Sequence, residues 1–169
     1  TGVDFKQYKN MVGAFHQPLL VYMNVSTLKT LPEEEFSSGM GEVLKHGLIR
    51  DKEYSRWISA HSKELLDRET QACGEMIYRS CVIKKTVVEQ DPTEKGERAL
   101  LNMGHTIGHA VEKLKNFSLL HGQCVAIGCA ASAFLSWKKG WISQTEYEEI
   151  KDQLQAFGLP VRTQGLKKE

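Results

Sequence analysis

The sequence contains no long hydrophobic run and almost no net charge. No stretch approaches the roughly 18 consecutive apolar residues of a membrane-spanning helix, so we expect no membrane partner. The 22 basic and 21 acidic residues leave a formal charge of +1. A nearly neutral chain has little electrostatic attraction for nucleic acid, so we predict no nucleic-acid partner either. Internal repeats and low-complexity tracts are also missing, and 169 residues suffice for one domain with a hydrophobic core.

The cysteines form neither a metal-binding nor a disulfide pattern. The four of them include no Cys-x-x-Cys pair, which argues against a thiolate zinc site. Cys73 and Cys81 fall in one segment with apolar residues at helical spacing, and Cys124 and Cys129 fall in another. We therefore expect all four to be small buried residues with free thiols, in a reducing compartment. No secretory signal is visible, and we predict a cytoplasmic protein. The chain opens at Thr1 without an initiator Met, so we expect a fragment of a longer protein.

Strand patterns are scarce and helical periodicity dominates. Leu19–Met23 is the one convincing buried-strand run, and its partners would have to lie in a part of the protein outside this chain or in a second copy. Apolar residues at helical spacing recur through the rest of the chain. We therefore predict a mainly α fold, a helical bundle with a short remnant strand at its N-terminus. The predicted helices cover residues 33–48, 51–66, 68–89, 98–115, 119–139 and 145–156.

One segment late in the chain carries the residues that point most directly to chemistry. His105 and His109 are four positions apart, so on a helix both imidazoles project from one face. His121 follows after a short loop. Imidazoles arranged in this way are suited to hold a divalent metal. Gly104 and Gly108 lie beside them, and glycine is tolerable inside a helix where a substrate or a neighbouring helix must approach the backbone closely.

The same pattern also has a purely structural interpretation. A His-x-x-x-His pair can be two half-buried histidines bonded to carbonyl groups, and no Glu directly follows His105 as it would in a zincin. Arg98 and Asn102 add polar groups to an otherwise apolar helix, and burying so many polar groups without a task would cost stability. We therefore favour a functional site over core histidines.

Six motifs occur in an order that resembles one enzyme family. They are Lys9–Pro18, Leu28–Pro32, Gly39–Lys45, Ile83–Lys84 with Val87, Val88 and Asp91, Arg98–His109, and Leu120–Gly122. Together they resemble 3-dehydroquinate synthase over nearly the whole chain. Members of that family have an N-terminal nucleotide-binding α/β domain, then an all-helical metal-binding domain, with the active site between them. The resemblance implies that residues 1–26 are the end of the first domain, with its substrate loop and last strand, and that residues 27–169 are the helical domain that binds metal and substrate.

Carried over by position, the resemblance implies Glu42, His105 and His121 as the ligands of zinc or cobalt. One carboxylate and two neutral imidazoles leave open positions for substrate hydroxyl groups, as a catalytic zinc requires. His109 is implied in proton handling or in binding the phosphate, not the metal. Judged on the residues alone, Glu42 fits a solvent-exposed helix carboxylate equally well.

The resemblance also implies which residues surround the substrate and NAD. Judged one at a time and without the resemblance, Lys45 and Lys84 fit solvent-exposed surface lysines better than they fit functional residues. Arg98 judged in this way fits an ion-pair partner at a helix terminus. We assign His46 and His61 to the surface. The implied catalytic residues are His109, Lys84, Asn102, Arg98 and Lys45; the implied substrate-binding residues are Lys9, Asn10, Lys84, Arg98, Asn102 and His109; the implied NAD contacts are Thr27, Thr30 and Leu31.

The implied reaction converts 3-deoxy-arabino-heptulosonate 7-phosphate to 3-dehydroquinate and phosphate, a lyase step of the shikimate pathway that leads to chorismate and the aromatic amino acids. NAD would transiently oxidise a ring hydroxyl of this phosphorylated sugar acid. Because the chain lacks most of an NAD domain, we expect it to be folded but inactive and the longer parent to be a homodimer.

Three alternatives stay open: a sister sugar phosphate cyclase such as 2-deoxy-scyllo-inosose synthase, a metal-dependent alcohol dehydrogenase, and a non-catalytic helical interaction module with buried histidines.

Overall fold

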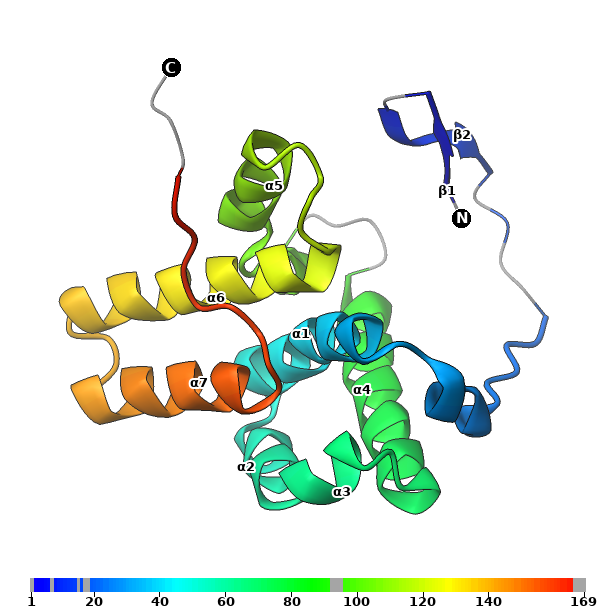
Figure 1. The fold of residues 1–169 in the computed structure, drawn as a ribbon, viewed down its shortest axis with the longest axis horizontal. Helices are drawn as coiled ribbons and strands as arrows, with labels where there is room; N and C mark the ends of the chain where they lie inside the picture. Colours follow the sequence, from blue (N-terminus) through cyan, green and yellow to red (C-terminus); the bar gives the residue numbers. More distant parts are fainter. Residues whose placement is uncertain (1, 7, 15, 17–18, 92–95, 166–169) are drawn as a thin grey trace.

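The computed structural model describes residues 2–6, 8–14, 16, 19–91 and 96–165, and it confirms a mainly α fold (Figure 1). The helices enclose one main core and leave a small strand pair at the N-terminal end. Their bounds are η1 (Val25–Thr30), α1 (Glu33–Arg50), α2 (Lys52–Ala60), α3 (Ser62–Leu66), α4 (Thr70–Gln90), η2 (Glu97–Asn102), α5 (His105–Leu114), α6 (His121–Lys138) and α7 (Gln144–Ala156), where η marks a 3-10 helix.

The N-terminal strands do not lie where the sequence predicted one. β1 (Gly2–Phe5) pairs antiparallel with β2 (Tyr8–Gly13) in a hairpin that lies apart from the helices in Figure 1. Leu19–Met23, the predicted strand, has no regular secondary structure and is exposed throughout. That placement was wrong because an apolar run becomes a strand only where a neighbour supplies hydrogen bonds. Within the described residues, no strand pairs with Leu19–Met23.

Two of the predicted helices are interrupted. The span 51–66 forms α2 and α3, and the break falls at His61, whose Nδ1 lies 2.9 Å from the carbonyl oxygen of Trp57. The span 98–115 forms η2 and then α5, separated at Gly104, where φ is +79°. A Cβ at Gly104 would lie 2.8 Å from the carbonyl oxygen of Val125. Glycine therefore meets two needs at this point, a left-handed backbone and close contact with α6.

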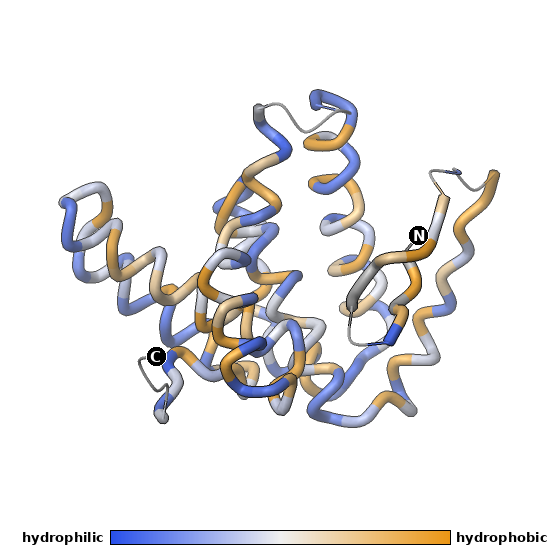
Figure 2. The backbone as a smooth tube through the Cα atoms, turned by 90° about the horizontal axis from the view of Figure 1, so that it is seen from above, coloured by the Kyte–Doolittle hydropathy of each residue, from blue (hydrophilic) through white to orange (hydrophobic). Residues whose placement is uncertain are grey.

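The main core lies between α1, α2, α3, α4, α6 and α7. Met40 and Leu44 of α1 are almost completely buried in it, and so is Tyr54 of α2. The Tyr54 hydroxyl lies 2.7 Å from the carbonyl oxygen of Met76 and 2.8 Å from Oγ of Ser80, both on α4. Figure 2 shows hydrophobic and hydrophilic segments alternating along most helices, as expected where each helix buries one face. This packing fixes α1, which carries the first residue of the candidate site.

Helix α6 is buried along most of its length and runs between α5 and α1 in Figure 1. Glycines allow both neighbours to approach it closely. A Cβ on Gly128 would lie 1.9 Å from the carbonyl oxygen of Gly104, and one on Gly122 would lie 1.7 Å from that of Ser38. The helix predicted over residues 119–139 is thereby confirmed as α6. In the part of the chain that the structure describes, no helix is long and apolar enough to cross a membrane.

Candidate metal and substrate site

Four potential metal ligands from three helices converge at the N-terminal end of α6. Oε1 of Glu42, on α1, lies 3.6 Å from Nε2 of His105 and 3.7 Å from Nε2 of His121. The His109 ring, one turn after His105 on α5, lies with its centroid 5.2 Å from that of His105 and 5.7 Å from that of His121. The structure therefore brings together residues that are up to 79 positions apart in the sequence (121 − 42 = 79).

Glu42 is held as a carboxylate although it is partly buried. Burial raises its pKa, but the contact with His121 and the charge and hydrogen bond of Lys45 outweigh this and lower the pKa to about 2. Nζ of Lys45 donates to Oε2 of Glu42 at 2.5 Å. The other oxygen, Oε1, is buried and makes no hydrogen bond with any described residue. An ionised oxygen without a hydrogen-bond donor, facing two imidazole nitrogens, is suited to a divalent cation.

The histidines of the cluster differ in how their rings are held. Nδ1 of His105 lies 3.3 Å from the carbonyl oxygen of Met103, and Nδ1 of His121 lies 3.7 Å from Oε2 of Glu112. Burial lowers the pKa of His105, which favours the neutral imidazole that a metal requires. His109 is exposed. One nitrogen from each histidine lies within 4.8 Å of the others, so distance alone permits His109 as well as Glu42 beside the other two.

A polar cavity of about 230 Å³ lies next to the cluster. The predicted residues Lys45, Lys84, Arg98 and Asn102 all line it, so the structure brings these cationic and amide groups together beside Glu42 and His105. Anionic groups are the natural ligands of such a lining. The complete lining is Glu42, Lys45, His46, Lys84, Arg98, Leu101, Asn102 and His105.

His46 is a cavity residue that the sequence analysis wrongly placed on the surface. Its side chain is buried, with 8% exposure, and its Nδ1 makes no hydrogen bond with the described residues. Burial and the neighbouring charge of Lys45 lower its pKa to about 4. The sequence did hold a signal, because His46 follows Glu42 by four positions on α1 and so shares its face. His61 is half-buried, with its ring stacked on Trp57, and not simply a surface residue.

The backbone around Arg98 is anchored from two directions. Oδ2 of Asp91 accepts hydrogen bonds from the backbone N–H groups of Gly96 at 2.7 Å and Arg98 at 3.1 Å. Arg50, at the end of α1, donates to Oε2 of Glu97 at 2.9 Å. These contacts fix the start of η2 relative to α1 and α4, and with it the position from which Arg98 reaches the cavity.

The remaining predicted residues lie elsewhere or are only partly described. Lys9 and Asn10 belong to β2, and their side chains lie outside what the structure describes. Thr27 and Thr30 are in η1, where their hydroxyls donate to the carbonyl oxygens of Asn24 and Thr27. Leu31 directly follows η1 and packs against the main core.

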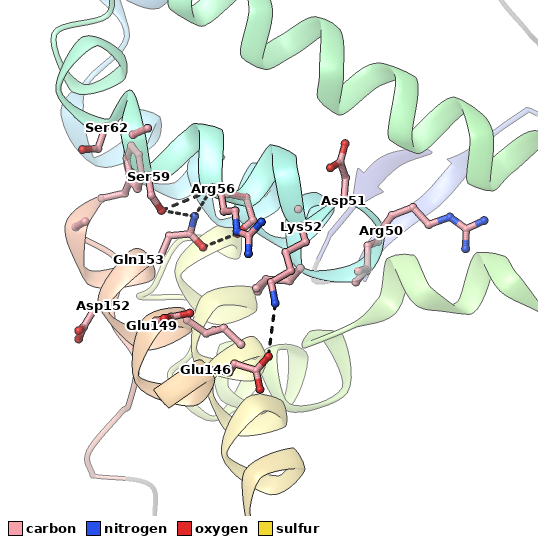
Figure 3. A pocket seen from close by; sticks show the side chains of 18 of the residues that line it. Arg50, Asp51, Lys52, Arg56, Ser59, Ser62, Glu146, Glu149, Asp152 and Gln153 are labelled. Carbon is pink, nitrogen blue, oxygen red and sulfur yellow. Dashed lines mark hydrogen bonds and ion pairs between the residues drawn. The ribbon is translucent and has the colours of Figure 1, made fainter. Parts of the chain in front are cut away.

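A larger open cleft lies between the end of α1, α2 and α7. Its volume is about 1370 Å³, and Figure 3 shows polar side chains along its walls. Gln153 of α7 bridges to α2 through the carbonyl oxygen of Ser55 and the hydroxyl of Ser59. None of the predicted site residues lines this cleft, so the smaller cavity remains the candidate for substrate binding.

Fold and site together define a helical domain with donors for a divalent cation beside a cavity for an anionic ligand. Family comparison makes this specific: the chain belongs to the 3-dehydroquinate synthase family. The C-terminal part of that family matches residues 39–169, and the N-terminal part matches residues 1–38. The recognition made from six motifs is thereby confirmed.

Individual relatives agree with the family match. The 3-dehydroquinate synthases of Acetivibrio thermocellus and Symbiobacterium thermophilum are 44% and 49% identical to this chain, over 98% and 95% of its length. The chain spans 46% and 45% of those two proteins, just under half of each. A 2-epi-5-epi-valiolone synthase from Streptomyces hygroscopicus, solved with NAD+ and Zn2+ bound, superimposes with a TM-score of 0.87 at 27% identity. That likeness covers 96% of this chain and 46% of the synthase.

Proposed function

We propose that this chain is the helical, metal- and substrate-binding part of a 3-dehydroquinate synthase, which converts 3-deoxy-arabino-heptulosonate 7-phosphate to 3-dehydroquinate and phosphate. The observation that carries the proposal is the approach of Glu42 Oε1 to Nε2 of both His105 and His121, beside a cavity lined by cationic side chains. The relatives support the reaction, because proteins named 3-dehydroquinate synthase align with nearly the whole of this chain.

Glu42, His105 and His121 are the proposed ligands of zinc, with cobalt as a substitute. When bound, the cation would act as a Lewis acid for neighbouring hydroxyl groups of the substrate. The protein's own contribution is to keep the donors ready. The contacts with His121 and Lys45 keep the pKa of Glu42 low although burial opposes them, and burial favours the neutral form of His105. The valiolone synthase, solved with Zn2+ and NAD+, supports both cofactors for this chain.

Lys84, Arg98 and Asn102 are the proposed binding groups for the phosphorylated sugar acid, together with Lys45. Their side chains line one cavity, and a guanidinium group can bind a carboxylate or phosphate through two parallel hydrogen bonds. His109 is exposed beside the ligand cluster, so we assign it to proton handling or phosphate binding and not to the metal. Lys9 and Asn10 stay predicted substrate contacts.

We further propose that residues 1–26 complete an N-terminal domain that holds most of the NAD site, with Thr27, Thr30 and Leu31 touching the dinucleotide. The exposed apolar side chains of Leu19–Met23 support a missing neighbour at this end. The chain alone is then inactive, and the longer protein is a lyase and a homodimer. All four cysteines lie in the described part of the chain without a disulfide, which fits the reducing cytoplasm.

The proposal is tested by a turnover assay of the full-length parent protein. We expect phosphate release from the heptulosonate phosphate with no net reduction of NAD. Preference for a sugar phosphate without a carboxylate would instead favour a sister cyclase, which the likeness to the valiolone synthase makes the second candidate. Steady production of NADH from a simple alcohol would favour an alcohol dehydrogenase. Absence of bound zinc or cobalt in the purified protein would contradict the metal site altogether.

A further inference from the structure

Glu112 is a buried carboxylate that the proposed function does not use. It lies on α5, three positions after His109, and is only 5% exposed. Burying a carboxylate is costly unless another group compensates its charge or bonds to it. One contact of Glu112 reaches across to α6, where its Oε2 lies 3.7 Å from Nδ1 of His121.

The packing of α5 against α6 places these two residues opposite each other. A Cβ on Gly108 would lie only 2.9 Å from the carbonyl oxygen of Cys124, so the two helices are in close contact at that level. Glu112 follows Gly108 by one turn on α5, and His121 precedes Cys124 by nearly one turn on α6. Side chains at these positions therefore meet along the same interface.

The two ring nitrogens of His121 face two different carboxylates. Nδ1 faces Glu112, and Nε2 faces Oε1 of Glu42 at 3.7 Å. A neutral imidazole carries one proton, and both carboxylates can accept it, so Glu112 competes with Glu42 for that proton. The tautomer protonated at Nδ1, toward Glu112, is the one whose Nε2 lone pair is free for a cation beside Glu42. His105 has the same division of roles, because its Nδ1 faces the carbonyl oxygen of Met103 and its Nε2 faces Glu42. For His109, no hydrogen bond or ion pair to either ring nitrogen is found among the described residues.

We propose that Glu112 is a positioning residue: it holds the Nδ1 proton of His121 and so orients Nε2 toward Glu42. The inference deepens the proposed function, because it rests on His121 as a ligand of that same metal site. Acceptors behind a metal-binding histidine fix its tautomer and raise its basicity, and their loss weakens metal binding typically about 10- to 100-fold. Glu112 would thus matter to the metal although it does not touch it.

The experiment compares the 169-residue chain with Glu112→Gln and Glu112→Ala. Zinc affinity is measured by competition with a chromophoric chelator, and the His121 tautomer is measured in the metal-free protein by 15N NMR of the imidazole above pH 7.5. Glu89→Gln on α4, at an exposed position, removes the same charge and serves as the matched control. Glu112→Gln keeps the shape and an acceptor oxygen, so it remains informative should the alanine variant unfold.

We expect zinc affinity to fall about 10- to 100-fold in Glu112→Ala and less in Glu112→Gln, with a smaller population of the Nδ1-protonated tautomer in both. Glu89→Gln should match the unsubstituted chain. Unchanged affinity together with an unchanged His121 spectrum in both Glu112 variants overturns the inference and leaves the metal site standing. Failure of the unsubstituted chain to bind zinc would count against the proposed function, whereas the tautomer of His121 would still decide the role of Glu112.

Discussion

Gly122 of α6 touches the backbone of Ser38 on α1. A Cβ on Gly122 would lie 1.7 Å from the carbonyl oxygen of Ser38, and the Gly122 N–H donates to the Ser38 hydroxyl at 3.1 Å. Gly41 makes the reciprocal contact, since its own Cβ would lie 2.4 Å from the carbonyl oxygen of Gly122. The contacting glycines are the direct sequence neighbours of Glu42 and His121. Close approach of the two helices thus sets the distance between two proposed metal ligands.

Gly122→Ala is therefore expected to force α6 away from α1. A methyl group at this position meets backbone atoms, which cannot rotate aside, so we expect the free energy of unfolding to fall by roughly 3 kcal/mol and zinc affinity to fall with it. Urea denaturation and chelator competition measure the two effects. Gly74→Ala is the control, because a Cβ at Gly74 meets nothing within 4 Å, and it should raise stability by up to about 1 kcal/mol. A Gly122→Ala protein with unchanged stability and zinc affinity would contradict this account.

The second prediction separates His109 from the proposed ligands. In both His105 and His121, Nδ1 faces an acceptor and Nε2 faces Glu42. His109, in contrast, is exposed. We expect His109→Ala to keep about one zinc per chain, and Glu42→Ala or His105→Ala to lose most of it. In the full-length parent, His109→Ala should abolish turnover with its zinc still bound. Equal zinc loss in all three variants would show that His109 is a ligand as well. Zinc loss in His109→Ala and His105→Ala but not in Glu42→Ala would show that the three histidines form the site instead.

Most of the helices could be predicted from the sequence because the signals for a helix are local. The spacing of His105 and His109 and the apolar course of α6 are properties of neighbouring residues, and both predicted their helices. The break at Gly104 could not be predicted in the same way, because its cause is a backbone contact with Val125 on another helix. Leu19–Met23 illustrates the opposite error: local character favoured a strand, but the described part of the chain offers it no partner.

The candidate site was only partly accessible to sequence reasoning. Glu42 is 63 positions before His105 (105 − 42 = 63), and no spacing rule connects them, so it was identified only by family resemblance. Glu112 and His46 were missed because a charged or titratable residue on a helix is usually solvent-exposed. Only the packing of α1, α5 and α6 shows that both are buried. The catalytic and binding roles assigned to the site residues remain predictions.

The third prediction concerns Tyr54, away from the site. Its buried hydroxyl bonds to the carbonyl oxygen of Met76 and to Ser80, and burial raises its pKa to about 12. Tyr54→Phe leaves these groups without that partner, so we expect the free energy of unfolding to fall by about 1 to 2 kcal/mol with zinc affinity unchanged. Tyr78→Phe, at an exposed position on α4, should leave unfolding within about 0.5 kcal/mol of the original chain. Equal effects of the two substitutions in urea denaturation would exclude a special role for the buried hydroxyl.

The last prediction is a pH dependence caused by His46. Burial and then the charge of Lys45 lower its pKa to about 4 in the folded chain, against 6.5 for an ordinary histidine; Lys84 adds to the shift and Glu42 opposes it. The unfolded chain therefore binds the proton more readily, and protonation favours unfolding. The stability that neutral His46 contributes is complete above pH 6.5 and is lost as the pH falls toward 4.

His46→Gln removes this titrating group. Between pH 7 and pH 4, we expect the unsubstituted chain to lose roughly 2 to 3 kcal/mol more of its unfolding free energy than the variant does. Urea denaturation across that range, with a chelator present so that metal binding does not contribute, measures the difference. Above pH 7 the two stability curves should run parallel, because His46 is neutral in both the folded and the unfolded chain. Parallel curves down to pH 4 would mean that the folded protein accommodates a charged His46, and that the cavity beside Glu42 is wetter than its burial indicates.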